Sequence, residues 1–139
     1  MTINIRIKLA HSDAKVPTKN NFADAGWDLY SVEHKRINTT PYSIETHNIF
    51  GIGNMDISTP YGATVIKTGI HIQIPKGFVG LIWDRSGMAI KNSIHRVAGV
   101  IDSGFSGEVM IGLLNFGPAY EVKAGDRLPS FYFKKFPCM

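Results

Sequence analysis

The 139-residue sequence lacks several features that would each point to a class of protein. It contains one cysteine, Cys138, which cannot form an internal disulfide, so we expect a reducing compartment. No apolar run approaches the ~20 residues that cross a bilayer. The first fifteen residues contain no apolar stretch typical of a secretory signal. We therefore expect a cytoplasmic protein with no membrane partner, or one of the host cytoplasm if the source is viral.

Clusters of like charge and histidine spacings typical of metal sites are also lacking. The net charge is +4, from 15 Lys and Arg against 11 Asp and Glu, and the basic residues are scattered. A nucleic-acid partner would require a clustered basic stripe, so none is expected. The five histidines show no metal-ligand spacing, which disfavours a zinc site. The Walker A run and the GxSxG nucleophile elbow are absent as well.

Helical periodicity is nearly absent, and alternation of apolar and polar residues takes its place. Residues 3–9 and 70–74 alternate in this way, while both faces of residues 109–114 are apolar or small. Residues 127–133 are also strand-like, and Pro129 favours an edge or a bulge there. One short helix is predicted over residues 86–92, with Ser86 as its N-cap, and residues 45–62 are predicted to be a long loop. The pattern predicts one all-β domain over residues 1–139, built as a sandwich, jelly roll or barrel.

Two short segments in the first two-thirds of the chain suit the binding of a cation and of phosphate, respectively. In Ala-Gly-Trp-Asp-Leu-Tyr-Ser, residues 25–31, Asp28 is costly in an apolar strand unless it is paired or bound to a cation. It could also simply cap a strand end. In Asp-Arg-Ser-Gly-Met-Ala, residues 84–89, an apolar run leads into the predicted helix. Arg85 offers donors to phosphate, Ser86 a hydroxyl and Gly87 a close backbone approach, although a plain helix cap is the alternative.

Two later segments form turns that carry polar residues. Residues 99–109, Gly-Val-Ile-Asp-Ser-Gly-Phe-Ser-Gly-Glu-Val, are predicted to be a hairpin that turns at residues 102–104. Asp102 would project from a strand end, and Phe105 would be exposed enough to cover a flat ring. A turn-forming Asp beside an incidental aromatic is the alternative. Residues 125–128, Gly-Asp-Arg-Leu, are compatible with a simple turn into the next strand.

In this order and spacing, the four segments resemble the first four motifs of the trimeric dUTP pyrophosphatases (dUTPases), over roughly residues 3–133. The resemblance implies a jelly-roll-like β subunit in a threefold homotrimer, with three active sites at the subunit interfaces. It implies a hydrolase that converts dUTP to dUMP and pyrophosphate. It also implies Mg²⁺ as the cofactor, held mostly by triphosphate oxygens and water, with indirect help from Asp28.

The resemblance also implies a role for each site residue. Asp102 would be the general base, activating a water for in-line attack on the α-phosphorus. Phe105 stands where the family usually has Tyr, and its ring would stack on the deoxyribose. The other substrate-binding residues would be Arg85, Ser86 and Gly87 for the phosphates, Gly99, Val100, Ile101 and Met110 for the uracil, and Arg127 from the fourth motif.

The sequence departs from the family pattern at several positions. Asp84 replaces the usual Pro before Arg-Ser-Gly, Arg96 replaces an Asn found in some members, and Pro129-Ser130 replaces Ala-Gln. The Gly-rich fifth motif is not found among the last residues, so the arm it forms would be missing, replaced or cut off. A catalytically weak homologue with a regulatory or binding role is therefore an alternative. A dCTP deaminase is a further one, but that family places a catalytic Glu where this chain has Gly112.

Overall fold

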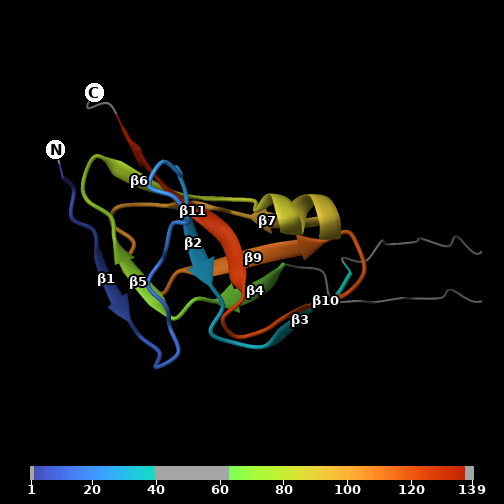
Figure 1. The fold of residues 1–139 in the computed structure, drawn as a ribbon. Coiled ribbons are helices and arrows are strands. Elements are labelled where there is room, and N and C mark those ends of the chain that lie inside the picture. The colour runs from blue at the N-terminus through green and yellow to red at the C-terminus, as the bar shows by residue number, and fades with distance from the viewer. Residues whose placement is uncertain (1, 40–62, 137–139) are drawn as a thin grey trace, which may run out of the picture.

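The computed structural model describes residues 2–39 and 63–136, whose regular secondary structure is almost entirely β (Figure 1). The predicted loop at residues 45–62 and Cys138 lie outside the described residues. The elements in chain order are β1 (Arg6–Leu9), β2 (Trp27–Tyr30), β3 (Lys35–Ile37), β4 (Thr64–Lys67), β5 (Ile70–Gln73), β6 (Phe78–Trp83), η1 (Gly87–Lys91), β7 (Ile94–Val97), β8 (Val100–Ile101), β9 (Met110–Asn115), β10 (Tyr120–Val122) and β11 (Arg127–Lys135).

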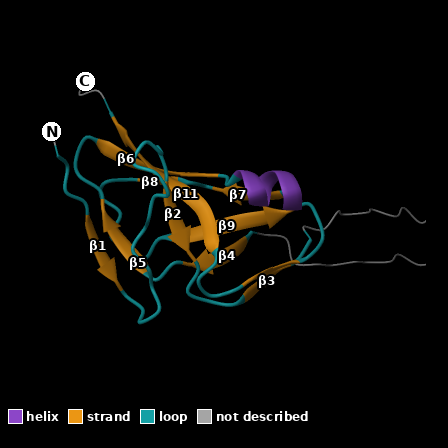
Figure 2. Cartoon of the chain, in the orientation of Figure 1, coloured by secondary structure: helices purple, strands orange, loops and turns teal. Residues whose placement is uncertain are grey.

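The strands pair antiparallel in four small sheets. The largest has the order β2-β11-β6-β8, and a three-stranded sheet has the order β4-β9-β7. The pairs β1-β5 and β10-β3 complete the set. Since most neighbours in these sheets are distant in the sequence, the chain crosses repeatedly between sheets. This is the all-β arrangement that the alternating pattern predicts, in the jelly-roll-like form that the family resemblance implies. Figure 2 shows the one helix of the described residues at the side of the strands.

A single hydrophobic cluster joins the two larger sheets. Leu29 and Phe131 come from the four-stranded sheet, while Ile66, Ile111 and Leu113 come from the three-stranded one. Each of these side chains is at most 1% exposed. Burying one such side chain contributes about 1.5–3 kcal/mol, so this shared interior is the main force holding the two sheets together. The described residues include no helix with the length and apolar character of a membrane span.

Two strands differ from the sequence-based prediction in their position or burial. Only part of residues 3–9 forms β1, and Ile3 and Leu9 are exposed, while Ile5 and Ile7 pack against the core. Pro129 lies in β11, which is central between β2 and β6, so the predicted edge position is wrong. The predicted bulge is confirmed, because the β11–β2 register shifts between Leu128 and Phe131. The shift accommodates a residue that has no N–H to donate.

Residues 99–109 do not form the predicted hairpin. β8 pairs with β6, whereas β9 pairs with β4 and β7, so the two strands belong to different sheets. The turn itself exists, because the N–H of Phe105 donates a 3.0 Å hydrogen bond to the carbonyl of Asp102. The chain then crosses from one sheet to the other, and the N–H of Val109 bonds to the carbonyl of Ile70. The sequence pattern predicted both strands but not their partners.

The predicted helix is confirmed, and Ser86 stands at its predicted N-cap position. η1 is a single π-helical turn over Gly87–Lys91, with Ser86 and Asn92 as its caps. Ser86 already has helical backbone angles and makes no capping hydrogen bond with its side chain. The Ser86 hydroxyl therefore makes no hydrogen bond to the first turn of the helix, and the residue is exposed.

Candidate active site

A cavity of about 390 Å³ lies between β8 and β9. Cavities of roughly 300–1,000 Å³ are typical of small-molecule sites. Among the described residues that line it, Asp102 is the one acid, and the others are apolar or glycine. Six of the predicted site residues meet here: Gly99, Val100, Ile101, Asp102, Phe105 and Met110. This first cavity thus combines an apolar wall with one negative charge.

Asp102 directly follows β8 and extends from the end of a paired strand. The pairs Gly80–Ile101 and Leu81–Val100 hold β8 against β6. On the other side of Asp102, the turn closed by the Phe105 amide restrains its backbone. The residue itself is exposed. Its carboxylate is therefore held on a fixed backbone but remains open to a ligand and to water.

β8 is the edge strand of the four-stranded sheet, with β6 on one side and no described strand on the other. An edge strand presents backbone N–H and C=O groups that no neighbouring strand uses. Val100 and Ile101 form β8 and also line the first cavity. The unused edge of the strand can therefore supply directional hydrogen bonds to a ligand that enters an otherwise apolar space.

The ring of Phe105 lies at the first cavity and is 44% exposed. Gly107 makes this position possible, because a Cβ added at Gly107 would lie 2.9 Å from Cζ of the ring. Any other residue at position 107 would have to displace the ring. The packing therefore keeps an aromatic face close to Asp102, where the sequence predicts a stacking surface.

A second cavity, of about 310 Å³, lies beside β2, β11 and the start of η1. Arg85, Arg127 and Asp28 line it, so three further predicted residues meet here. Nη1 of Arg127 is 3.7 Å from Oδ2 of Asp28, and the Asp28 side chain is 17% exposed. This ion pair explains how the strand tolerates a half-buried carboxylate. The two arginines make the cavity suitable for an anion.

The two cavities share no lining residue within the described part of the chain. Ser86 and Gly87 line neither of them, although they follow Arg85 directly. One copy of the chain therefore brings the predicted residues together in two groups, one around Asp102 and one around Arg85. The described residues also contain no group of three or more His, Cys, Asp or Glu side chains that could hold a metal ion by themselves.

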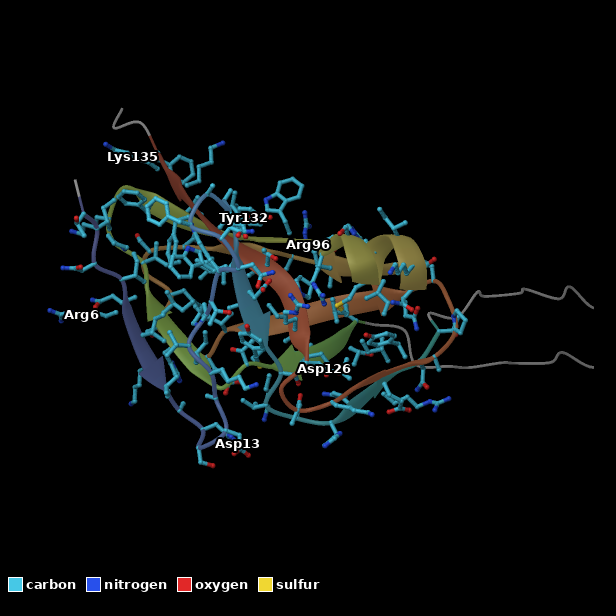
Figure 3. The ribbon with its side chains drawn as sticks, in the orientation of Figure 1. Arg6, Asp13, Arg96, Asp126, Tyr132 and Lys135 are labelled. Carbon is cyan, nitrogen blue, oxygen red and sulfur yellow. The ribbon has the colours of Figure 1, made fainter. Side chains whose placement is uncertain are left out.

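The sequence analysis missed several residues of the second cavity, among them Asn20, Asp24, Ser130 and Tyr132. Gly26 explains the position of Tyr132, which Figure 3 labels, because a Cβ at Gly26 would lie 2.7 Å from Cζ of that ring. Ser130 occupies the place of the family's Gln, so a hydroxyl remains at this position. The alternation of Ser130 and Tyr132 along one strand was the available signal for both. Asn20 and Asp24 lie in an unpatterned loop and gave none.

Residues 53–134 match the family model of the dUTPases. The chain is 34% identical over 128 residues to the deoxyuridine 5'-triphosphate nucleotidohydrolase of Candida albicans, covering 91% of this chain and 67% of the relative. The same enzyme of Saccharomyces cerevisiae is 32% identical over 133 residues, covering 94% of this chain and 76% of the relative. That of fowlpox virus is 37% identical over 123 residues, with coverage of 88% and 70%.

Solved structures agree on the fold. A mutant dUTPase from phage phi11 of S. aureus, described with a structural Mg(II) ion, superposes with a TM-score of 0.79 at 21% identity, covering 99% of this chain and 94% of that one. A mutant dUTPase of phage 80alpha gives a TM-score of 0.80 at 22% identity, covering 100% and 87%. The matched family model, the relatives and the shared fold together show that this chain belongs to the dUTPase family.

Proposed function

We propose that this protein hydrolyses dUTP to dUMP and pyrophosphate, with Asp102 as the general base. The observation that carries the proposal is the first cavity, where a single carboxylate at a strand end faces an apolar pocket beside an aromatic ring. The curated relatives, named deoxyuridine 5'-triphosphate nucleotidohydrolases, support the choice of substrate.

The uracil ring of the substrate would enter the first cavity, where backbone groups would recognise it. Uracil has donors and acceptors along one edge, and the unused edge of β8 at Val100 and Ile101 can match them. Gly99 and Met110 would complete the polar contacts at either side. Val65 and Gly112 contribute an apolar wall, which would exclude an added 5-methyl group by its shape, while the backbone donors and acceptors would disfavour an amino group in place of a carbonyl.

Asp102 would orient and deprotonate the water that attacks the α-phosphorus in line. A general base of this kind contributes about 10²–10⁴-fold to the rate. The Phe105 ring would stack on the deoxyribose, and this contact requires the ring face but not the hydroxyl of Tyr. Gly112 provides no side chain to carry protons, so the cavity offers no group for deamination at the position where a dCTP deaminase carries Glu.

Arg85 and Arg127 would bind the phosphates at the second cavity, and Ser86 and Gly87, which directly follow Arg85, would bind them from beside it. Since this cavity is separate from the first within one copy, a complete site would require the first cavity of one chain and the second cavity of another. We therefore propose a homotrimer with its active sites at the subunit interfaces. The half-exposed Val100 and Met110 at the first cavity are consistent with a surface that another copy covers.

The donor set at the second cavity suits Mg²⁺ that is held mainly by the substrate. Among the described residues of this cavity, Asp28 and Asp24 carry the carboxylates, and Asp28 already pairs with Arg127. Mg²⁺ commonly binds through one or two carboxylates together with phosphate oxygens and water, so this set fits. When bound, the ion would neutralise triphosphate charge, and Asp28 would assist through water.

Measuring pyrophosphate release from dUTP, dTTP and dCTP, each with and without Mg²⁺, tests this function. We expect rapid release from dUTP with Mg²⁺, and weak or no release from the other two nucleotides. A purified, folded protein that releases no pyrophosphate from dUTP would contradict the proposal. Ammonia release from dCTP would instead favour deamination.

A further inference from the structure

A polar cluster outside both cavities joins the end of β6 to the middle of β7. Oδ1 of Asp84 accepts a 2.8 Å hydrogen bond from the backbone N–H of Arg96, and Oδ2 lies 2.5 Å from Nδ1 of His95. The guanidinium carbon of Arg96 lies 5.1 Å from the centre of the Trp83 ring, a cation–π distance. Figure 3 labels Arg96 next to η1. Two of the departures from the dUTPase pattern, Asp84 and Arg96, therefore contact each other.

The turn that follows β7 has an unfavourable backbone. Ala98 has a φ of +61° and Gly99 a φ of +105°. A non-glycine residue in this region costs about 1–3 kcal/mol and persists only where its surroundings impose it. Both residues line the first cavity, immediately before β8. The shape of the turn therefore determines where the proposed base-reading edge begins.

Arg96 supplies much of the support for this turn. Its Nη1 donates a 3.2 Å hydrogen bond to the carbonyl of Ala98, and its Cδ would lie 3.3 Å from a Cβ at Gly99. The N–H of Ile82 holds the carbonyl of Gly99 at 2.7 Å. Nε of Arg96 is buried without a hydrogen-bond partner among the described residues, so the guanidinium is held by its other contacts.

We propose that Asp84 and Arg96 are positioning residues that brace the Ala98–Gly99 turn. They would thereby fix the position of the backbone groups that recognise the uracil. Asp84 holds the Arg96 main chain, Trp83 holds the guanidinium plane, and the guanidinium holds the Ala98 carbonyl. A Pro at position 84 would offer no side-chain acceptor, so this brace is available only because Asp stands there. The inference rests on the proposed hydrolysis of dUTP and adds two residues that line neither cavity.

Three variants test the brace. Arg96→Met keeps an aliphatic stem but removes the donors, including the unpartnered Nε, so we expect the fold to persist. Asp84→Ala removes the acceptor, and Asp84→Asn keeps an acceptor oxygen of the same shape. In the Met and Ala variants KM for dUTP should rise about three- to tenfold with kcat within about twofold, as for the loss of a binding contact worth one or two net hydrogen bonds. Asp84→Asn should restore most of the affinity.

Hydrogen exchange of the substrate-free protein gives a readout that does not depend on activity. The backbone amides of residues 98–101 should exchange faster in Arg96→Met and Asp84→Ala than in the wild type. Lys91→Met is a matched control, because it removes an exposed cation from the neighbouring helix and leaves the Asp84–Arg96 and Arg96–Ala98 hydrogen bonds in place. It should change neither KM nor the exchange rates.

The outcomes separate this inference from the proposed function. Unchanged exchange at residues 98–101 in Arg96→Met overturns the brace, whatever happens to KM. A fall in kcat at constant KM also overturns it, because the residue would then act in the chemical step. If the wild-type protein hydrolyses no dUTP, the proposed function fails, and faster exchange in the two variants would still support the brace.

Discussion

Asp102 is the residue on which the proposed chemistry depends most directly, and its surroundings allow a clean substitution. The side chain is exposed, and only its backbone takes part in the turn with Phe105. Asp102→Asn should therefore keep the fold and most of the affinity for dUTP. Turnover should fall by ~10²-fold or more, the scale of losing a general base. Steady-state kinetics will measure this, and near-wild-type kcat in a folded Asn variant would exclude Asp102 as the base.

Arg85 should act mainly through binding of the triphosphate, whereas Asp102 should act on turnover. The residue is half-buried at the second cavity, where a charge-assisted contact is stronger than on an open surface. Arg85→Ala should lose about 2–4 kcal/mol of transition-state stabilisation, measured as a fall in kcat/KM. Lys91→Ala, which removes an exposed cation of η1, is the control and should leave kcat/KM unchanged. Equal losses in both variants would mean that Arg85 acts through general charge and has no specific phosphate contact.

At the scale of elements, the packing of β6 against β11 depends on a glycine. A Cβ added at Gly80 would lie 2.5 Å from Cζ of Phe131 and 2.8 Å from Cδ1 of Ile74, both in the buried core. Gly80→Ala should lower the free energy of unfolding by about 1–3 kcal/mol, the usual cost of overpacking. Urea unfolding at a constant protein concentration will measure the change.

Gly104→Ala is the matched control for this substitution. A Cβ at Gly104 would meet no atom within 4 Å, and the residue does not have a positive φ. Its unfolding midpoint should stay close to that of the wild type. If both variants shift the midpoint equally, the loss comes from the glycine backbone in general and the Phe131 contact is not responsible.

The elements were predictable from the sequence to different degrees, and each difference has a physical cause. Alternation is a local property, so several strands, among them β1, β5, β9 and β11, were predicted near their observed positions, as was the short helix, whereas β3, β4, β7 and β10 were not predicted. Strand partners depend on contacts between distant residues, and for this reason the hairpin predicted at residues 99–109 is instead a crossing between sheets. Pro129 illustrates the same limit, because its missing N–H required a bulge but did not specify an edge.

The candidate site followed the same division between local and distant information. Residues adjacent in one motif, such as Gly99 to Asp102, line one cavity because the motif itself places them side by side. The grouping of Arg85 with Asp28 and Arg127 depends on η1, β2 and β11 meeting in space, which spacing alone does not reveal. The contact between Asp84 and Arg96 was invisible for the same reason, although each residue stood out as a departure from the family pattern.

At the scale of the whole molecule, the proposed trimer should be detectable directly. The first cavity is bordered by exposed apolar side chains, with Val65 40%, Val100 65% and Met110 50% exposed. Exposed apolar groups around a cavity favour coverage by another copy. Light scattering at micromolar concentration should give three times the chain mass of 15.4 kDa. A stable monomer would contradict both the trimer and the sharing of sites between chains.

Mixing two inactive variants distinguishes shared sites from sites within one chain. Asp102→Asn damages the first cavity, and Arg85→Ala damages the second. We assume that each site of the closed oligomer joins the first cavity of one chain to the second cavity of a neighbour. After random co-assembly each of these cavities is undamaged in about half of the sites, so both are intact in about one site of four. Co-expressed variants should therefore recover roughly a quarter of the wild-type activity, given that closed symmetry. A mixture of Asp102→Asn with Asp102→Ala should recover none, because every first cavity remains damaged. If the first mixture is as inactive as this control while light scattering shows mixed trimers, each site is formed within one chain, and the two cavities must approach each other by a rearrangement of the subunit itself.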